Sequence, residues 1–183
     1  KLGVSRMPVR EAFRLMESMG LIQSTPYAGS VVRKLTKEET KEIYILRMNL
    51  ESLACRYAAE RITLSALIEL EEIQRKMEMV CSYEVTAETY KLLYQYNRDF
   101  HHTIYAASKM PKLCEFIDNL WNSIAYSRIK YISNPEYGER MKQEHRLYID
   151  YLKKHDGEGF AKSVAGNLQK HYDLFAEKEE AND

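Results

Sequence analysis

The chain has 183 residues, of which 45% are apolar, so it can form a packed core and wholesale disorder is excluded. Its 27 Lys and Arg balance its 27 Asp and Glu, but residues 1–34 carry a net charge of +4 and the remaining residues a net charge of −4. This asymmetry within one chain predicts two parts with different partners.

Composition excludes several other classes of protein. The seven Gly and four Pro are too few turn residues for an all-β fold. No apolar run approaches the roughly 20 residues of a membrane span, and no signal-peptide pattern opens the chain. The three Cys are widely spaced without a CxxC pair, which is typical of reduced core cysteines. We therefore expect a cytoplasmic protein without a membrane partner.

The first predicted element is a helix that starts at Ser5 and ends at Gly20. Ser is a favourable N-cap, and Pro8 lies in the first turn, where its missing N–H costs little. Apolar residues recur at spacings of three and four, which predicts an amphipathic helix with the following stripe: Val9, Ala12, Phe13, Met16 and Met19. Arg6, Arg10 and Arg14 occupy the opposite face.

Two short β-prone runs follow, Leu21–Ser24 and Ser30–Arg33, on either side of a turn that contains Pro26 and Gly29. This pattern predicts a β-hairpin. It is the only convincing strand signal in the sequence.

The rest of the chain is predicted to be helical. Thr36 and Glu39 form a capping box before the first long helix. Five more helices are expected at about 65–80, 86–107, 110–131, 134–154 and 160–177, with a break at 156–159. Short loops and no intervening strands predict an antiparallel bundle of about six helices.

The N-terminal part has the chemistry of a DNA reader. A helix followed by a small hairpin is how a winged helix-turn-helix ends, with the helix in the major groove and the hairpin as the wing. Arg6 and Arg10 lie four residues apart near the helix N-terminus, and Arg binds guanine edges and phosphates. A solvated basic face on an ordinary surface helix is the alternative.

The segment Gly3–Ala12, GVSRMPVREA, resembles the recognition helix of the GntR family of bacterial transcription regulators. Phe13–Ile22 and Gly29 continue the resemblance into the wing. It implies that Ser5, Arg6, Met7, Arg10 and Gly29 contact DNA, although Met7 stands where the family usually has a small polar residue. It also implies that the first helices of this DNA-binding domain precede the chain, so the visible N-terminus is not the natural one.

The helical part resembles the FadR subfamily, whose effector domain is the all-helical FCD domain. Three landmarks carry the resemblance: RMNLE at 47–51, NRDFH at 97–101, and Glu144-His145 with Asp156 eleven residues later. The implied organisation is a partial winged helix-turn-helix at 1–35 and an FCD-type effector-binding and dimerisation domain at 36–183.

Several N and O ligands can converge inside this bundle. Asn97 and His101 lie i, i+4 on one helix face, His145 comes from another helix, and Asn167 and His171 lie i, i+4 on the last. Such a set can hold a divalent metal of the Zn, Ni or Mn class, although satisfied core or surface histidines are the alternative.

The FCD resemblance implies an Asp or Asn and three His as metal ligands, with a small carboxylate effector on the metal. Alignment from Asp156 puts Asn167 at the third His, so His171 serves only if the register shifts by one turn. Asn97 and Asn167 are neutral amides, which bind a hard cation less well than carboxylates do.

Arg47 is the predicted effector contact, because a buried guanidinium needs an anion and fits a carboxylate bidentately. An ion pair with Glu51, one turn along, is the alternative. Four tyrosines could line a polar pocket: Tyr94, Tyr105, Tyr126 and Tyr148. The expected effector-binding residues are thus Arg47, Asn97, His101 and His145.

Together these features predict a homodimeric, ligand-responsive repressor that binds operator DNA and senses a small organic acid. A metal-dependent enzyme is one rival hypothesis, with no obvious general base except Asp99 or Glu144. A metabolite sensor that does not bind DNA is another. We expect no enzymatic activity.

Overall fold

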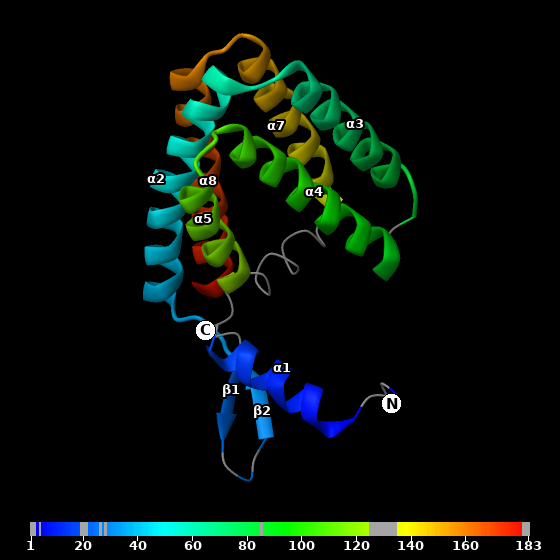
Figure 1. The fold of residues 1–183 in the computed structure, drawn as a ribbon, viewed down its shortest axis with the longest axis vertical. Helices are drawn as coiled ribbons and strands as arrows, with labels where there is room; N and C mark the ends of the chain where they lie inside the picture. The colour runs from blue at the N-terminus through cyan, green and yellow to red at the C-terminus, as the bar shows by residue number, and fades with distance from the viewer. Residues whose placement is uncertain are drawn as a thin grey trace. The chain divides into compact units, whose positions relative to one another are not determined.

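The computed structural model describes residues 3, 5–18, 22–25, 27, 29–84, 86–124 and 135–180, without the side chains of 135–137 and 177–180. These residues form seven helices and one two-stranded antiparallel sheet (Figure 1). The mainly α fold with a small hairpin is therefore confirmed. The chain divides into two compact units, Lys1–Thr40 and Lys41–Asp183.

The N-terminal unit contains α1 (Arg6–Ser18), β1 (Ile22–Thr25) and β2 (Gly29–Val32). Ile22 pairs with Val32 and Thr25 with Gly29, as the hairpin prediction requires. Gly29 has a φ of +91°, a left-handed conformation that favours Gly in this tight connection. The backbone N–H of Ser24 donates to Glu17 Oε1 at 3.2 Å, which ties the hairpin to α1.

The predicted stripe of α1 is not buried, and no residue of this helix is fully enclosed. Phe13 is 42% exposed, and Val9 and Met16 are half-buried. The predicted stop at Gly20, the stripe residue Met19 and the turn residue Pro26 lie outside the described residues.

The first long helix is α2 (Lys37–Arg61), and the predicted capping box is present at its start. The backbone N–H of Glu39 donates to Thr36 Oγ1 at 3.1 Å, and the N–H of Thr36 donates to Glu39 Oε2 at 2.9 Å. The same device recurs at α4 (Ala87–Ala107), which is capped by Thr86 and Thr89. Side-chain caps thus explain where both helices start.

The other helices differ from their predicted bounds at the ends. They are α3 (Leu64–Cys81), α5 (Pro111–Ser123), α7 (Pro135–Lys153) and α8 (Gly157–Glu180). The helix predicted at 110–131 ends at Ser123, and the segment 125–134 is outside the described residues.

The predicted break between the last two helices is present but lies at 154–156 rather than 156–159, because Gly157 and Gly159 belong to the first turn of α8. A Cβ on Gly157 would lie 2.8 Å from the backbone oxygen of Arg56. Gly157 therefore allows α8 to approach α2 closely. From the sequence alone, a Gly at such a contact cannot be distinguished from a Gly in a turn. Asp156 accepts a hydrogen bond from the Gly159 N–H at 2.9 Å and starts the helix.

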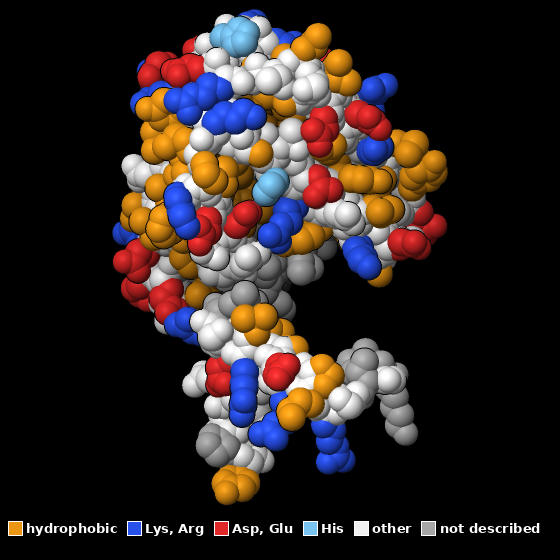
Figure 2. Space-filling model, viewed as in Figure 1, with side chains coloured by type: hydrophobic (Ala, Val, Ile, Leu, Met, Phe, Trp, Pro, Cys, Tyr) orange, Lys and Arg blue, Asp and Glu red, His pale blue; other side chains and the backbone are white. Residues whose placement is uncertain are grey.

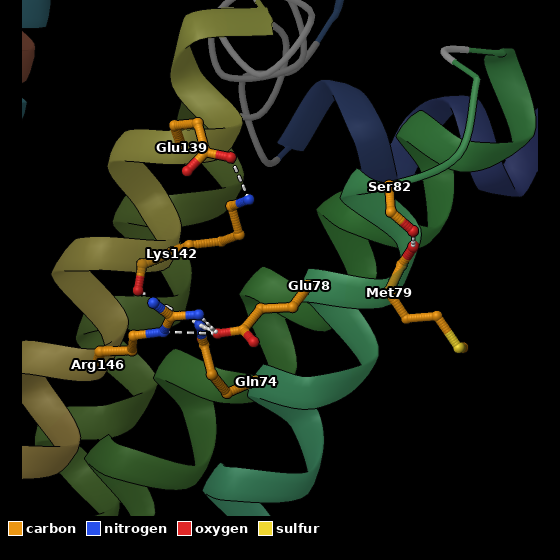
Figure 3. Close-up of polar contacts among 7 residues, drawn as sticks. All are labelled: Gln74, Glu78, Met79, Ser82, Glu139, Lys142 and Arg146. Atoms are coloured by element: carbon orange, nitrogen blue, oxygen red, sulfur yellow. Dashed lines mark hydrogen bonds and ion pairs between the residues drawn. The ribbon is translucent and has the colours of Figure 1, made fainter.

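Within the bundle, α3 packs against α4 and α7, and α2 lies against α5 and α8 (Figure 1). Polar side chains join α3 to α7 (Figure 3). Arg146 Nε donates to Glu78 Oε1 at 2.8 Å, and Gln74 donates to the same oxygen at 2.7 Å. The core between the helices is apolar, with Phe100, Leu70, Met77, Ile117, Leu152 and Phe160 among its fully buried members.

Candidate functional site

The predicted DNA contacts lie at the start of α1 and at the hairpin. Arg6 and Arg10 are exposed and one helical turn apart, and Ser5 directly precedes the helix. Met7 is 66% exposed. Figure 2 shows Lys and Arg side chains on the surface formed by α1 and the hairpin. No acidic residue lies in the first turn of α1, so its positive dipole end is unopposed there.

A second group of predicted residues meets inside the bundle. His101 on α4 and His145 on α7 point toward each other, with their Nε2 atoms 3.3 Å apart. The His145 ring stacks on Phe100 at a centroid distance of 4.0 Å, and Trp121 lies 5.1 Å from the His101 ring. Packing against aromatic rings therefore fixes both imidazoles.

Asn97 lies one turn before His101 and is 1% exposed. Neither its side-chain oxygen nor its nitrogen has a hydrogen-bond partner. An unsatisfied buried amide costs about 1–3 kcal/mol. Asn97 is therefore a polar group that a bound ligand or water would stabilise.

Helix α8 brings both of the alternative ligands to the same place. Asn167 Nδ2 donates to the Tyr148 hydroxyl at 2.9 Å. His171 Nε2 lies 3.7 Å from Glu144 Oε2. Both side chains line the cavity beside His101 and His145, so the helix register does not exclude either of them.

This cavity has a volume of about 30 Å³ and is lined by the following residues: Arg47, Glu51, Asn97, His101, Trp121, Glu144, His145, Tyr148, Val164, Asn167, Leu168 and His171. A water needs about 10–15 Å³ by this measure. The space therefore accommodates an ion with one or two waters, but not an organic acid. Trp121 was not predicted to line it, because no spacing in the sequence relates α5 to α4.

The donor atoms partly suit a metal. Two converging imidazole nitrogens and an unpartnered amide oxygen are usable ligands for Zn, Ni or Mn. However, no group of three or more His, Cys, Asp or Glu among the described residues is placed to hold an ion. The two imidazoles and the amide are all neutral, and without the amide only two ligands remain. This composition predicts weak binding of a metal ion.

Arg47 is paired with Glu51, the alternative partner. Its Nε donates to Glu51 Oε1 at 2.6 Å, and its guanidinium lies 5.5 Å from the Trp121 ring centre. Burial is the largest single effect and lowers the pKa of Arg47, but the charge of Glu51, its hydrogen bond and the neighbouring tyrosines together raise the pKa by more. Arg47 therefore faces the cavity as half of an ion pair rather than as an unmatched cation.

Of the four tyrosines, Tyr105 and Tyr148 contact this site. Burial, followed by a nearby carboxylate, raises the pKa of each well above its ordinary value. Tyr94 is half-buried against the core and Tyr126 lies outside the described residues.

Residues 42–170 match the model of the FCD domain. The transcriptional regulator McbR of Escherichia coli is 30% identical over 172 residues, which cover 92% of this chain and 76% of McbR. The chain belongs to the FCD family. The solved structure of McbR superposes with a TM-score of 0.83 at 27% identity over 97% of this chain and 88% of McbR.

Two other proteins are consistent with this assignment, RspR by its sequence and a protein from Rhodococcus by its fold alone. RspR, a transcriptional repressor of E. coli, is 26% identical over 171 residues, which cover 92% of this chain and 72% of RspR. A regulator described as GntR from Rhodococcus shares the fold, with a TM-score of 0.74 at 20% identity over 94% and 81% of the two chains. The FCD chain described here is thus a ligand-responsive transcription regulator and not an enzyme.

The rival hypothesis of a metal-dependent enzyme is therefore dropped. A transcription regulator implies DNA as a partner. Among the described residues no helix is long and apolar enough to cross a membrane.

Proposed function

We propose that this FCD regulator acts in the cytoplasm as a homodimeric repressor whose DNA affinity is set by a small carboxylate bound in the bundle. Residues 1–35 supply the DNA-reading part and 36–183 the sensing and dimerisation part. Ser5, Arg6, Met7, Arg10 and Gly29 contact the operator. The similarity to the repressor RspR supports the direction of regulation.

The observation that carries the sensing proposal is the convergence of His101 and His145 beside the unpartnered Asn97. Asn97 Oδ1, His101 and His145 would hold a divalent cation, with Asn167 or His171 as a further ligand. Because these donors are neutral, a divalent cation keeps net positive charge even beside the Glu144 carboxylate that lines the cavity, and this charge attracts a small carboxylate.

The effector then requires more room than 30 Å³. Asn167 and Tyr148 are joined across the cavity by a hydrogen bond between α8 and α7, so separating them enlarges the site. An effector that binds the enlarged arrangement more tightly shifts the bundle toward it. That differential affinity is what couples the site to DNA binding.

Calorimetric titration of the chelator-treated chain with Zn²⁺, Ni²⁺ and Mn²⁺ in turn tests the cation site. We expect His101→Ala and His145→Ala to abolish a weak single-site binding. His102→Ala is the matched control, because His102 is the next residue of α4 and its side chain is 56% exposed. Equal binding by all three variants would show that the cation is held elsewhere.

The DNA proposal is tested by selecting duplexes from a random pool and measuring their affinity by fluorescence anisotropy. Arg10→Ala should weaken the selected duplex by about 1–3 kcal/mol, the worth of a good Arg–guanine pair. Arg75→Ala on α3 is the control. No selected sequence at physiological salt would favour the alternative of a sensor that does not bind DNA.

A further inference from the structure

The carboxylate of Glu51 is the centre of a buried polar network that the proposed function does not use. Oε1 accepts hydrogen bonds from Arg47 Nε at 2.6 Å and from Trp121 Nε1 at 2.9 Å. Oε2 accepts one from the Tyr105 hydroxyl at 2.6 Å. Helices α2, α4 and α5 each supply a member, and all four side chains are almost completely buried.

The proton of the Tyr105 hydroxyl can point in only one direction. A carboxylate accepts and cannot donate, so Tyr105 donates to Glu51. This hydrogen bond, at 2.6 Å, uses the one proton of the hydroxyl. The same oxygen lies 3.3 Å from His101 Nδ1, and toward this nitrogen it can only accept.

His101 must then carry its proton on Nδ1 and have a lone pair on Nε2. We propose that Glu51 and Tyr105 are positioning residues that hold His101 in the Nδ1–H tautomer, with its bare Nε2 directed at His145. In the cation-free protein His145 supplies the proton between the two Nε2 atoms, which are 3.3 Å apart. This inference deepens the proposed cation site. Only its consequence for metal binding rests on that site, because a nitrogen that binds a metal must carry no proton.

An isosteric substitution should reverse the direction of the hydrogen bonds that run from Glu51 through Tyr105 and His101 to His145. In Glu51→Gln the amide oxygen must take the place of Oε1, because Arg47 and Trp121 both donate there. The amide NH₂ then faces Tyr105 and donates to its oxygen, so the Tyr105 proton turns toward His101 Nδ1. His101 becomes the Nε2–H tautomer, and His145 becomes the acceptor.

The test is a long-range ¹H–¹⁵N correlation spectrum of the full chain with ¹⁵N-labelled histidine, recorded after chelator treatment. A pH of about 8.5 lies above the ordinary imidazole range. The five histidines are assigned by single substitutions. The wild-type His101 should show a protonated Nδ1 and a bare Nε2, and Glu51→Gln should exchange the two. Glu158→Gln, which alters an exposed pair with Arg56, should leave His101 unchanged.

A wild-type His101 protonated on Nε2, or a Glu51→Gln variant that keeps the Nδ1 proton, would overturn the inference. If Glu51→Gln does not fold, Tyr105→Phe decides, because it removes the acceptor and should shift His101 toward Nε2–H. An unchanged tautomer in Tyr105→Phe would also overturn it.

Titration with Zn²⁺ alone separates the two proposals. We expect Glu51→Gln to bind Zn²⁺ about 10–100-fold more weakly than wild type, the usual effect of losing a partner behind a ligand. If the tautomers behave as described but wild type binds no metal, the cation site is refuted and the positioning role is supported.

Discussion

Removal of the Arg47 guanidinium should be the most damaging single change in the bundle. In Arg47→Met the charge of Glu51 remains buried with only Tyr105 and Trp121 as donors. Breaking a buried ion pair from one side costs about 3–5 kcal/mol. This is a large share of the ~5–15 kcal/mol by which such domains are stable.

Arg56 provides a matched control on the same helix. It also pairs with a glutamate, Glu158, at 2.9 Å, but the two side chains are 43% and 75% exposed. Exposed pairs contribute about 0–1 kcal/mol, so Arg56→Met should change the free energy of unfolding very little. Arg56 and Glu158 lie on different helices, but burial is the difference between the two pairs that sets the expected size of the effect.

Urea unfolding followed by tryptophan fluorescence is the appropriate assay. Trp121 is the only tryptophan of the chain and donates to Glu51, so its emission reports the bundle alone. At a slope of ~2 kcal/mol per molar urea, Arg47→Met should lower the midpoint by ~2 M. A loss no larger than that of Arg56→Met would refute the reasoning that Arg47 serves to neutralise Glu51.

Other predictions concern the rest of the structure. The hydrogen bond from Arg146 lowers the pKa of Glu78; burial raises this pKa by less, and the hydrogen bond from Gln74 lowers it further. The stabilisation from Glu78 is therefore present above the unfolded pKa of about 4.3 and is lost as the pH falls through the folded value. Glu78→Gln should therefore lower the urea midpoint slightly at pH 7, and the difference should vanish in acid; a difference that persists at pH 3 would contradict it. Gly157→Ala should destabilise α8 by forcing its first turn away from α2, whereas Gly166→Ala, with nothing within 4 Å, should stabilise it by roughly 0.5–1 kcal/mol in thermal unfolding. The opposite signs are the test. The affinity of Arg10→Ala for random duplex, measured by fluorescence anisotropy, should fall less steeply with salt than that of wild type, because in a complex without the operator's guanine this guanidinium contacts phosphate instead.

Local chemistry made part of this structure predictable. The Thr36–Glu39 capping box depends only on residues three apart, and it forms as expected. The i, i+4 spacing of Asn97 and His101 likewise places both on one face of α4, and both line the cavity.

Contacts between helices could not be predicted in the same way. Trp121 reaches Glu51 from a helix 70 residues away, and no periodicity encodes which faces of α2 and α5 meet. Arg47 had two possible partners, an effector carboxylate and Glu51. The sequence does not show whether Glu51 is buried beside Arg47, and this decides between them. Gly157 reads as a turn residue until the close approach of Arg56 is known.

The enclosure of the cavity has a consequence for the speed of the response. Asn97 and His145, which face the cavity, are each only 1% exposed, so a solute larger than water reaches them only after the side chains around the cavity move apart. Association is then limited by how often the bundle opens, and departure by the same motion. Local openings of this kind take microseconds to seconds. The response of such a regulator therefore follows the ligand concentration averaged over the time between openings of the bundle, and briefer fluctuations do not affect it.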